Sequence, residues 1–196
     1  DGEKAQAYLE EDDVNPQSVY GATKQQGEAA ITDTTNRHII LRTSWVFGAY
    51  GNNFLKTMLR LAAEREALSI VNDQIGAPTS AALIADVTAH IVRDYLAFGE
   101  EFIAECTGIF HLAADGETNW HGYAQYVITL ADQAGMTLKI KATDVSGIPS
   151  SDYPTPAKRP ANSRLNTEKL KAVFDLQLPN WQDGVSHAFA MIHNQK

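Results

Sequence analysis

A tyrosine and a lysine spaced by four residues are the side chains of this sequence best suited to acid–base chemistry. Tyr20 and Lys24 lie in the stretch Val-Tyr-Gly-Ala-Thr-Lys-Gln-Gln-Gly-Glu, residues 19–28. On a helix, residues with this spacing share one face, one turn apart. A neighbouring ammonium favours the phenolate form of a tyrosine, so the phenol can give a proton to a reacting oxygen and recover it near neutral pH. Such a pair also occurs by chance on solvated helices, and the spacing alone leaves both interpretations open.

The elements that must position this pair are a helix and the strand that follows it. The turn at Asn15-Pro16 predicts a helix from about Pro16 to Thr34. The apolar run Ile39–Leu41, bounded by polar residues, is typical of a short buried strand. It leads to a loop with two glycines at residues 48–53, and ligands of open α/β sheets bind beyond the carboxyl ends of strands. Trp45 stands between strand and loop, a position that by itself favours packing in the core.

The rest of the chain also alternates between helical and extended patterns. Apolar residues recur at spacings of three and four over residues 53–65 and 82–98, as in amphipathic helices. Residues 144–164 are rich in Pro, Ser and Asp, and we expect a long loop there, the kind of segment that often carries function. Further helices are expected over 119–134, from Asn166 onward and over 181–193, and further strands over Leu68–Val71, Gly108–Ala113 and, with a weaker pattern, Leu138–Ala142.

Composition indicates a globular protein and argues against several classes of partner. The chain of 196 residues has 44% hydrophobic and 20% charged residues, which are ordinary values for a globular protein. Its net charge of −8 and the lack of a basic cluster argue against nucleic-acid binding. No apolar run is long enough to suggest a membrane span. Cys106 is the single cysteine, which fits a reducing compartment, so we expect a cytoplasmic protein.

His111 is a further residue whose type invites a chemical role. It lies in the apolar stretch Gly108–Ala113, where a lone histidine is more often packed than bound to a metal. Since no His or Cys partner stands at the spacing that zinc sites use, we predict no metal site.

Four motifs in a fixed order resemble the dTDP-4-dehydrorhamnose reductase family of extended short-chain dehydrogenases/reductases. They are Tyr20–Glu28, Leu41–Phe47, Asp73–Thr79 and Tyr153–Leu165, and the resemblance runs through nearly the whole chain. It implies an α/β fold, the C-terminal part of a doubly wound Rossmann-type fold plus a smaller α/β substrate-binding lobe. The implied division is 1–48 for the dinucleotide-binding domain with the Tyr-x-x-x-Lys helix, 49–80 for a substrate-lobe segment, 81–115 for a return to the Rossmann sheet, and 116–196 for the substrate-binding lobe.

The resemblance also implies a reaction. Members of the family reduce the 4-keto group of dTDP-4-dehydro-6-deoxy-L-mannose to give dTDP-L-rhamnose, with NADPH or NADH as cofactor. Tyr20 is then the proton donor, and Lys24 holds the nicotinamide ribose and makes the Tyr20 phenol more acidic, so both residues also bind the cofactor. Hydride delivered to the carbonyl carbon builds negative charge on the oxygen, which the Tyr20 proton neutralises.

Binding of the dTDP-sugar substrate is implied for four further residues. Trp45 matches a family position that contacts the sugar nucleotide, which changes its interpretation from core residue to substrate contact. Asn53, Gln74 and Arg159 are assigned to the substrate lobe on weaker grounds. The Arg159 guanidinium has the shape to bind two diphosphate oxygens at once, and simple solvation at the surface is the alternative.

The sequence departs from the family pattern at its beginning. The family starts with a strand, a glycine-rich turn and a helix that binds the cofactor pyrophosphate, and no such motif occurs in these 196 residues. The resemblance places that region, and a catalytic Ser or Thr, before Asp1. We therefore expect the chain to be part of a longer reductase, to lack the pyrophosphate site and to be inactive alone. Exposed apolar surface is also expected, and pairing of two chains as a homodimer is one way to cover it.

Two other functions remain open from the sequence. Another nucleotide-sugar epimerase or dehydratase of the same superfamily would share the Tyr-x-x-x-Lys pair, although the motifs Asp73–Thr79 and Tyr153–Leu165 favour the reductase. A non-catalytic regulatory subunit with the reductase fold could keep Tyr20 and Lys24 as relics.

Overall fold

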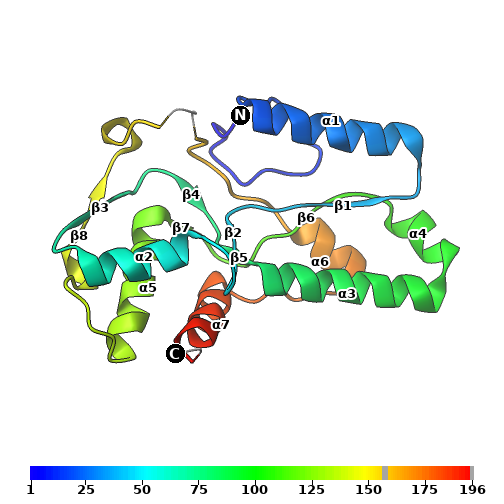
Figure 1. Ribbon diagram of the computed structural model, residues 1–196. Coiled ribbons are helices and arrows are strands. Elements are labelled where there is room, and N and C mark those ends of the chain that lie inside the picture. Colours follow the sequence, from blue (N-terminus) through cyan, green and yellow to red (C-terminus); the bar gives the residue numbers. More distant parts are fainter. Residues whose placement is uncertain (156–158, 195–196) are drawn as a thin grey trace.

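The structure, a computed structural model, describes residues 1–155 and 159–194 (Figure 1). Pro156, Ala157 and Lys158 of the fourth sequence motif lie outside the described residues. The helices are α1 (Val19–Thr34), α2 (Phe54–Glu64), α3 (Ala81–Phe98), α4 (Glu100–Cys106), α5 (Trp120–Gln133), α6 (Glu168–Phe174) and α7 (Trp181–His193). The strands are β1 (Ile39–Arg42), β2 (Val46–Phe47), β3 (Leu68–Val71), β4 (Ile75–Gly76), β5 (Thr79–Ser80), β6 (Gly108–His111), β7 (Thr118–Asn119) and β8 (Val145–Ile148).

The strands form pairs, three of them parallel. The parallel pairs are β1 with β6, β2 with β5 and β3 with β8, whereas β4 pairs with β7 in the antiparallel sense. Parallel neighbours need a long crossover between them, and the helices of this chain supply these crossovers. The β1–β6 pair runs from Ile39 opposite Gly108 to Arg42 opposite His111. The α/β class predicted from the sequence is therefore confirmed.

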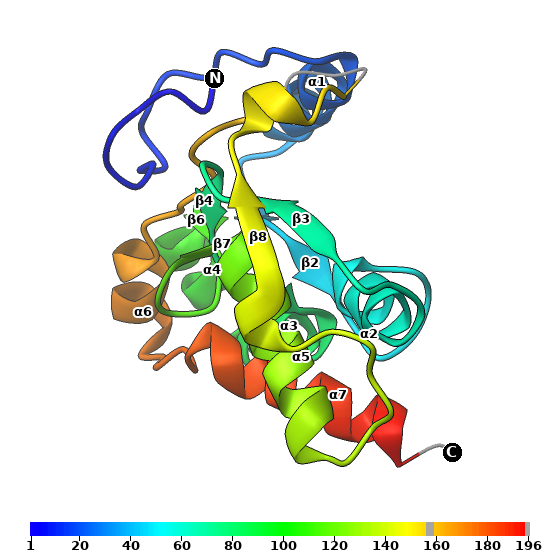
Figure 2. The ribbon, with the colours of Figure 1, turned by 90° about the vertical axis from the view of Figure 1, so that its left-hand side faces the viewer.

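Two of the three hydrophobic clusters contain most of the buried apolar residues. One lies between α2, α5 and α7, which stand close together beside the β3–β8 pair in Figure 2. The other lies between α3, β6 and α6. The buried faces follow the apolar spacing of the sequence; on α5, for example, Tyr123, Ala124, Val127, Ile128 and Ala131 are all buried.

Side-chain caps fix where the main helices begin. Asn53 accepts a hydrogen bond from the Lys56 amide at 3.1 Å at the start of α2, and Asn119 caps α5 in the same way. Ser18 accepts from the Gly21 amide at 3.1 Å and has an extended backbone, so α1 begins at Val19 rather than near Pro16 as predicted. The predicted final helix over residues 181–193 is confirmed.

The region after α5 differs from the sequence prediction. The weak strand predicted over Leu138–Ala142 is wrong, and the strand of this region is β8, inside the stretch that was predicted to be a loop. Ile140 is 4% exposed and packs in the core without a strand partner among the described residues, so its apolar signal was misleading. β8 contains Gly147, a residue type that is depleted in strands, and it exists because it pairs with the distant β3.

The short helix α4 was not predicted from the sequence. Gly99 separates it from α3 with a φ of +67°, a backbone conformation that favours glycine. The helical pattern of the preceding segment therefore stops at Phe98, and the chain starts a new helix in another direction.

Helix α1 stands apart from the two clusters, above β1 in Figure 1, and none of its residues is buried. Large apolar side chains are exposed on α1 and α3, among them Val19 at 82%, Leu96 at 76% and Phe98 at 67%. In the described part of the chain, no helix combines the length and apolar composition that crossing a membrane requires.

Leu55 offers a test of the α2–α5–α7 cluster. Its side chain is fully buried, so the Leu55→Ala substitution should lower the free energy of unfolding by about 2–5 kcal/mol through lost transfer energy and a residual cavity. Urea titration followed by circular dichroism measures this change. The matched control is Leu96→Ala on the exposed face of α3, which should change the free energy of unfolding by less than about 0.5 kcal/mol. Equal effects of the two substitutions would contradict the burial of Leu55 in this cluster.

Candidate active site

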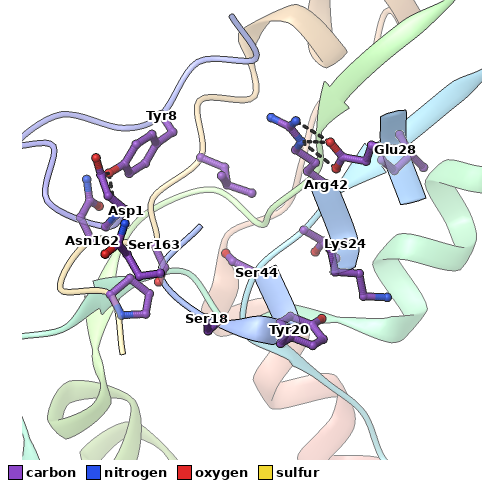
Figure 3. A pocket seen from close by; sticks show the side chains of 16 residues that line it. Asp1, Tyr8, Ser18, Tyr20, Lys24, Glu28, Arg42, Ser44, Asn162 and Ser163 are labelled. Atoms are coloured by element: carbon purple, nitrogen blue, oxygen red, sulfur yellow. Dashed lines mark hydrogen bonds and ion pairs between the residues drawn. The ribbon is translucent and has the colours of Figure 1, made fainter. Parts of the chain in front are cut away.

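A cavity of about 540 Å³ lies at the carboxyl end of β1. Three parts of the chain that are far apart in sequence form its walls: the first residues, α1 with the end of β1, and the late segment 160–165 (Figure 3). Tyr20 and Lys24 line it from α1, Thr43 and Ser44 follow directly after β1, and Asn162 lies on the opposite side. The strand end and part of the Pro-rich late stretch thus contribute to one cavity.

Tyr20 and Lys24 lie side by side on this cavity. The Lys24 ammonium nitrogen is 5.6 Å from the centroid of the Tyr20 ring, within the range of a cation–π contact. Tyr20 is 73% exposed, and Lys24 is also exposed, so both polar groups are accessible to a ligand. The structure therefore brings the predicted acid–base pair together on an open surface of the cavity.

An ion pair joins α1 to β1 next to this pair. The Arg42 guanidinium donates from Nε to Glu28 Oε1 at 2.9 Å and from Nη2 to Glu28 Oε2 at 2.5 Å. The two side chains are 22% and 21% exposed. The hydrogen bonds to Glu28 raise the pKa of Arg42 above its usual range. Neither residue was predicted to have a role, although Glu28 lies in the first sequence motif and Arg42 in the second.

Asn162 connects the late segment to the beginning of the chain. Its side-chain nitrogen donates to the carbonyl oxygens of Lys4 and Gln6, each at 2.7 Å. Its side-chain oxygen accepts from the amide of Arg164 at 3.0 Å and from the Arg164 Nε at 2.9 Å. Asn162 is only 7% exposed and its four hydrogen bonds use all of its polar capacity. This residue therefore fixes the wall of the cavity that faces α1.

Tyr8 organises the first residues in a similar way. Its hydroxyl oxygen accepts hydrogen bonds from the backbone amides of Gly2, Glu3 and Lys4 at 2.9, 3.0 and 3.2 Å, and it donates to Asp1 Oδ1 at 2.5 Å. One phenol oxygen thus lies within hydrogen-bonding distance of three successive amides. No signal within the local sequence indicated this role.

His111 is packed beneath the site, as the sequence predicted, with an exposed fraction of 1%. Its Nδ1 lies 3.1 Å from the Tyr8 carbonyl oxygen, and its backbone amide donates to Glu10 Oε1 at 2.9 Å. Burial lowers the pKa of His111, the nearby Arg42 lowers it further, and Glu10 opposes both effects. Among the residues described, no group of three or more His, Cys, Asp or Glu side chains is arranged to hold a metal ion.

Trp45 lies outside the lining of this cavity. Its ring stacks on Trp120 with the centroids 3.8 Å apart and the planes 17° from parallel. Its backbone φ is +48°, an uncommon conformation for a residue other than glycine. The ring also lies against Gly76, where a Cβ atom would come within 2.7 Å of Trp45 Cε2. Close packing on Gly76 and Trp120 thus determines the orientation of this side chain.

The other residues assigned to the substrate lobe fall into two places. Gln74 and Arg159 line a second cavity of about 420 Å³ together with Trp120, whose Nε1 donates to Gln74 Oε1 at 3.2 Å. Trp45 is connected to this cavity through its stacking on Trp120. Asn53 is not part of it; besides capping α2, its side chain donates to the Gly48 carbonyl oxygen at 2.7 Å. The predicted substrate residues are therefore only partly brought together.

Comparisons with known proteins find relatives that match nearly the whole chain. The family described as RmlD substrate binding domain matches residues 1–194. The dTDP-4-dehydrorhamnose reductase of Salmonella typhimurium is 53% identical over 178 residues, which are 91% of this chain and 57% of that protein. The protein of the same name from Escherichia coli K12 is 50% identical over the same shares. The chain thus spans little more than half the length of these curated relatives.

Solved structures agree with the fold. A dTDP-4-dehydrorhamnose reductase from Clostridium acetobutylicum gives a TM-score of 0.85 at 30% identity, covering 98% of this chain and 62% of that one. A second, from Bacillus anthracis in complex with NADP, gives 0.78 at 31% identity, covering 96% and 61%. A dTDP-glucose 4,6-dehydratase from the same organism, at 18% identity and a TM-score of 0.69, is similar in fold alone. The prediction of a Rossmann-type α/β fold, of which this chain covers a part, is confirmed.

The lowered pKa of His111 makes stability depend on pH. The unfolded chain binds a proton at this imidazole near pH ~6.5, whereas the folded chain keeps it neutral to lower pH. The contribution of His111 is therefore fully present above pH ~6.5 and is lost as the pH falls toward the folded pKa, by at most about 1.4 kcal/mol per pH unit. Urea titrations across this range should show a smaller fall in stability for His111→Gln than for the wild type. Equal pH dependences would show that another group is responsible.

Proposed function

Because the chain belongs to the RmlD substrate binding domain family, we propose that its protein reduces dTDP-4-dehydrorhamnose to dTDP-L-rhamnose with NADPH or NADH. The similar proteins from Salmonella typhimurium and Escherichia coli are named for the reductase, and the similar protein from Bacillus anthracis binds NADP. Since the chain spans 57% of the first of these relatives, the proposal concerns the whole protein. The present residues supply the proton donor and part of the substrate site.

One observation carries this proposal: Tyr20 and Lys24 lie together, accessible, on a cavity large enough for a sugar and a nicotinamide ring. The lysine ammonium is 5.6 Å from the tyrosine ring, and both line the cavity of about 540 Å³. Cavities of this volume are typical of small-molecule sites. A packed structural tyrosine would instead be buried, and this one is 73% exposed.

The residues of the cavity also suit a nicotinamide cofactor. The Lys24 ammonium is a donor for ribose hydroxyls. Ser44 lies on the same cavity, and its hydroxyl has no hydrogen-bond partner within the described part of the chain although its oxygen is buried. A buried polar atom of this kind requires a partner. When bound, the reduced nicotinamide supplies the hydride.

The mechanism then follows from the position of Tyr20. As hydride reaches C4 of the keto sugar, the carbonyl oxygen becomes negative, and the Tyr20 hydroxyl gives it a proton. This step forms the C–H and O–H bonds of the alcohol and leaves a phenolate on Tyr20. The Lys24 ammonium stabilises that phenolate electrostatically until it takes a proton from solvent.

The nucleotide of the substrate is proposed to extend toward the second cavity. There Gln74 and Arg159 lie with Trp120, and Trp45 stacks on that tryptophan. Arg159 is exposed and can bind a diphosphate through two parallel hydrogen bonds. Asn53 acts indirectly in this proposal, by holding the loop after β2 through its hydrogen bond to Gly48.

The proposal also includes the division of the chain into a dinucleotide-binding portion (1–48), a substrate-lobe segment (49–80), a return to the Rossmann sheet (81–115) and a substrate-binding lobe (116–196). It further includes the pairing of two chains as a homodimer.

Tyr20→Phe in the full-length protein tests the role of the proton donor. Loss of the hydroxyl should lower kcat by about 10²–10⁴-fold, with little change in KM for the dTDP-sugar, because the ring and its packing remain. The rate of NADPH oxidation at 340 nm, measured with dTDP-4-dehydrorhamnose, provides kcat and KM. The matched control is Tyr50→Phe, since Tyr50 is also 73% exposed but does not line this cavity; it should keep wild-type kcat.

Analysis of the product separates the competing functions. Formation of dTDP-L-rhamnose supports the reductase, whereas an epimerised or dehydrated sugar nucleotide would indicate another enzyme of the superfamily. A full-length protein without turnover that co-purifies with an active enzyme would indicate a regulatory subunit. A Tyr20→Phe variant with unchanged kcat would rule out the proposed proton donor.

A further inference from the structure

Helix α1 carries the proposed proton donor but is not held by burial. None of its residues is buried, and Val19, Tyr20 and Ile31 expose 82%, 73% and 45% of their surface. Helices in proteins draw most of their stability from packing one face against other elements, and the 16 residues of α1 include none that is buried. The position of Tyr20 and Lys24 must therefore depend on specific contacts at the helix ends or along its length.

The ends of α1 are fixed by hydrogen bonds between side chains and backbone groups. Before the helix, Ser18 caps the first turn. After it, the Thr107 hydroxyl donates to the Asn36 carbonyl oxygen at 2.8 Å, which joins the exit of the helix to the segment before β6. These contacts lie at the two ends, and neither fixes how the middle of the helix is rotated about its axis.

Glu28, further along α1, connects the helix to β1 through its side chain. Within the described residues, it is the one side chain of this helix whose hydrogen bonds reach another element, and it makes three of them to Arg42 on β1. Tyr20, Lys24 and Glu28 are spaced by four, so they lie on one side of the helix in successive turns (Figure 3). A rotation that moved Tyr20 would therefore also move Glu28 away from Arg42.

Arg42 is itself held in place. It lies at the end of β1, opposite His111 of β6 in the parallel pair, and its carbonyl oxygen accepts from the Leu112 amide at 2.8 Å. The pair is largely shielded from solvent, with side chains 22% and 21% exposed. Two parallel hydrogen bonds between a planar guanidinium and a carboxylate define an orientation as well as a distance.

We propose that the Glu28–Arg42 pair is the positioning device of the site: it sets the rotation of α1 against β1 and thereby places Tyr20 and Lys24 in the cavity. Neither residue needs to touch the substrate for this role. The catalytic part of the proposal rests on the proposed reductase function, whereas the mechanical part does not. The two parts therefore have separate measurements.

Hydrogen–deuterium exchange measures the mechanical part. In Glu28→Gln, which keeps the side-chain length but removes the carboxylate, amides in the middle of α1 should exchange at least about tenfold faster than in the wild type. Amides of α5 should exchange at the same rate in both proteins, which shows that the core is intact. Unchanged exchange in α1 would overturn the proposal.

Steady-state kinetics of the full-length protein measure the catalytic part. Glu28→Gln and Arg42→Gln should each lower kcat about 10- to 100-fold, because a displaced proton donor slows the chemical step. KM for the dTDP-sugar should change less than about threefold, since α1 does not line the second cavity. The double variant should lose no more than either single variant, because the two residues act as one unit. Losses that multiply would contradict the proposal.

The control is an ion pair beside the same strand that does not touch the cavity. Arg37 contacts Glu100 at 2.8 Å with side chains 59% and 75% exposed, and Glu100→Gln should leave both α1 exchange and kcat unchanged. A kcat loss equal to that of Glu28→Gln would overturn the assignment to this particular pair. Faster α1 exchange in Glu28→Gln combined with an inactive wild-type protein would support the positioning role and refute the reductase function.

Discussion

The parallel pairing of β1 with β6 is the contact on which the rest of this structure depends. It brings residues 39–42 beside residues 108–111, and the intervening chain must form the crossover. α1 leads into β1 through a short connection, so the pairing also determines where the Tyr-x-x-x-Lys helix lies. The carboxyl end of β1 carries Arg42 and the residues that line the cavity. The strand end that this pairing positions therefore also borders the candidate active site, as is common in open α/β sheets.

Elements whose signals are local were predictable from the sequence. α2 and α5 begin at asparagine caps and show apolar residues at helical spacing, and α7 was predicted with the bounds that it has. β8 was not predictable in this way, because Ser146 and Gly147 carry no strand signal and the strand forms only against β3. The apolar residue Ile140 suggested a strand in the wrong place. Pairing with a distant segment decided the outcome here.

The same distinction applies to the site. The spacing of Tyr20 and Lys24 was sufficient to predict that they would share a helix face, and the structure adds that they border a cavity. The opposite wall was not predictable, because Asn162 forms it by binding backbone carbonyls of residues 4 and 6. Carbonyl oxygens belong to every residue type, so no sequence pattern marks them as partners. Tyr8 is similar, since the groups it binds are backbone amides.

The contact of Trp45 with Gly76 has a consequence for how this family can vary. The indole fills the space where any larger residue at position 76 would place its first carbon. Across natural sequences, the two positions should therefore change as a correlated pair: a lineage that replaces the tryptophan by a small side chain becomes free to accept bulk at 76, and the reverse order of substitution is blocked. A glycine at position 76 would then be expected wherever an aromatic ring occupies position 45.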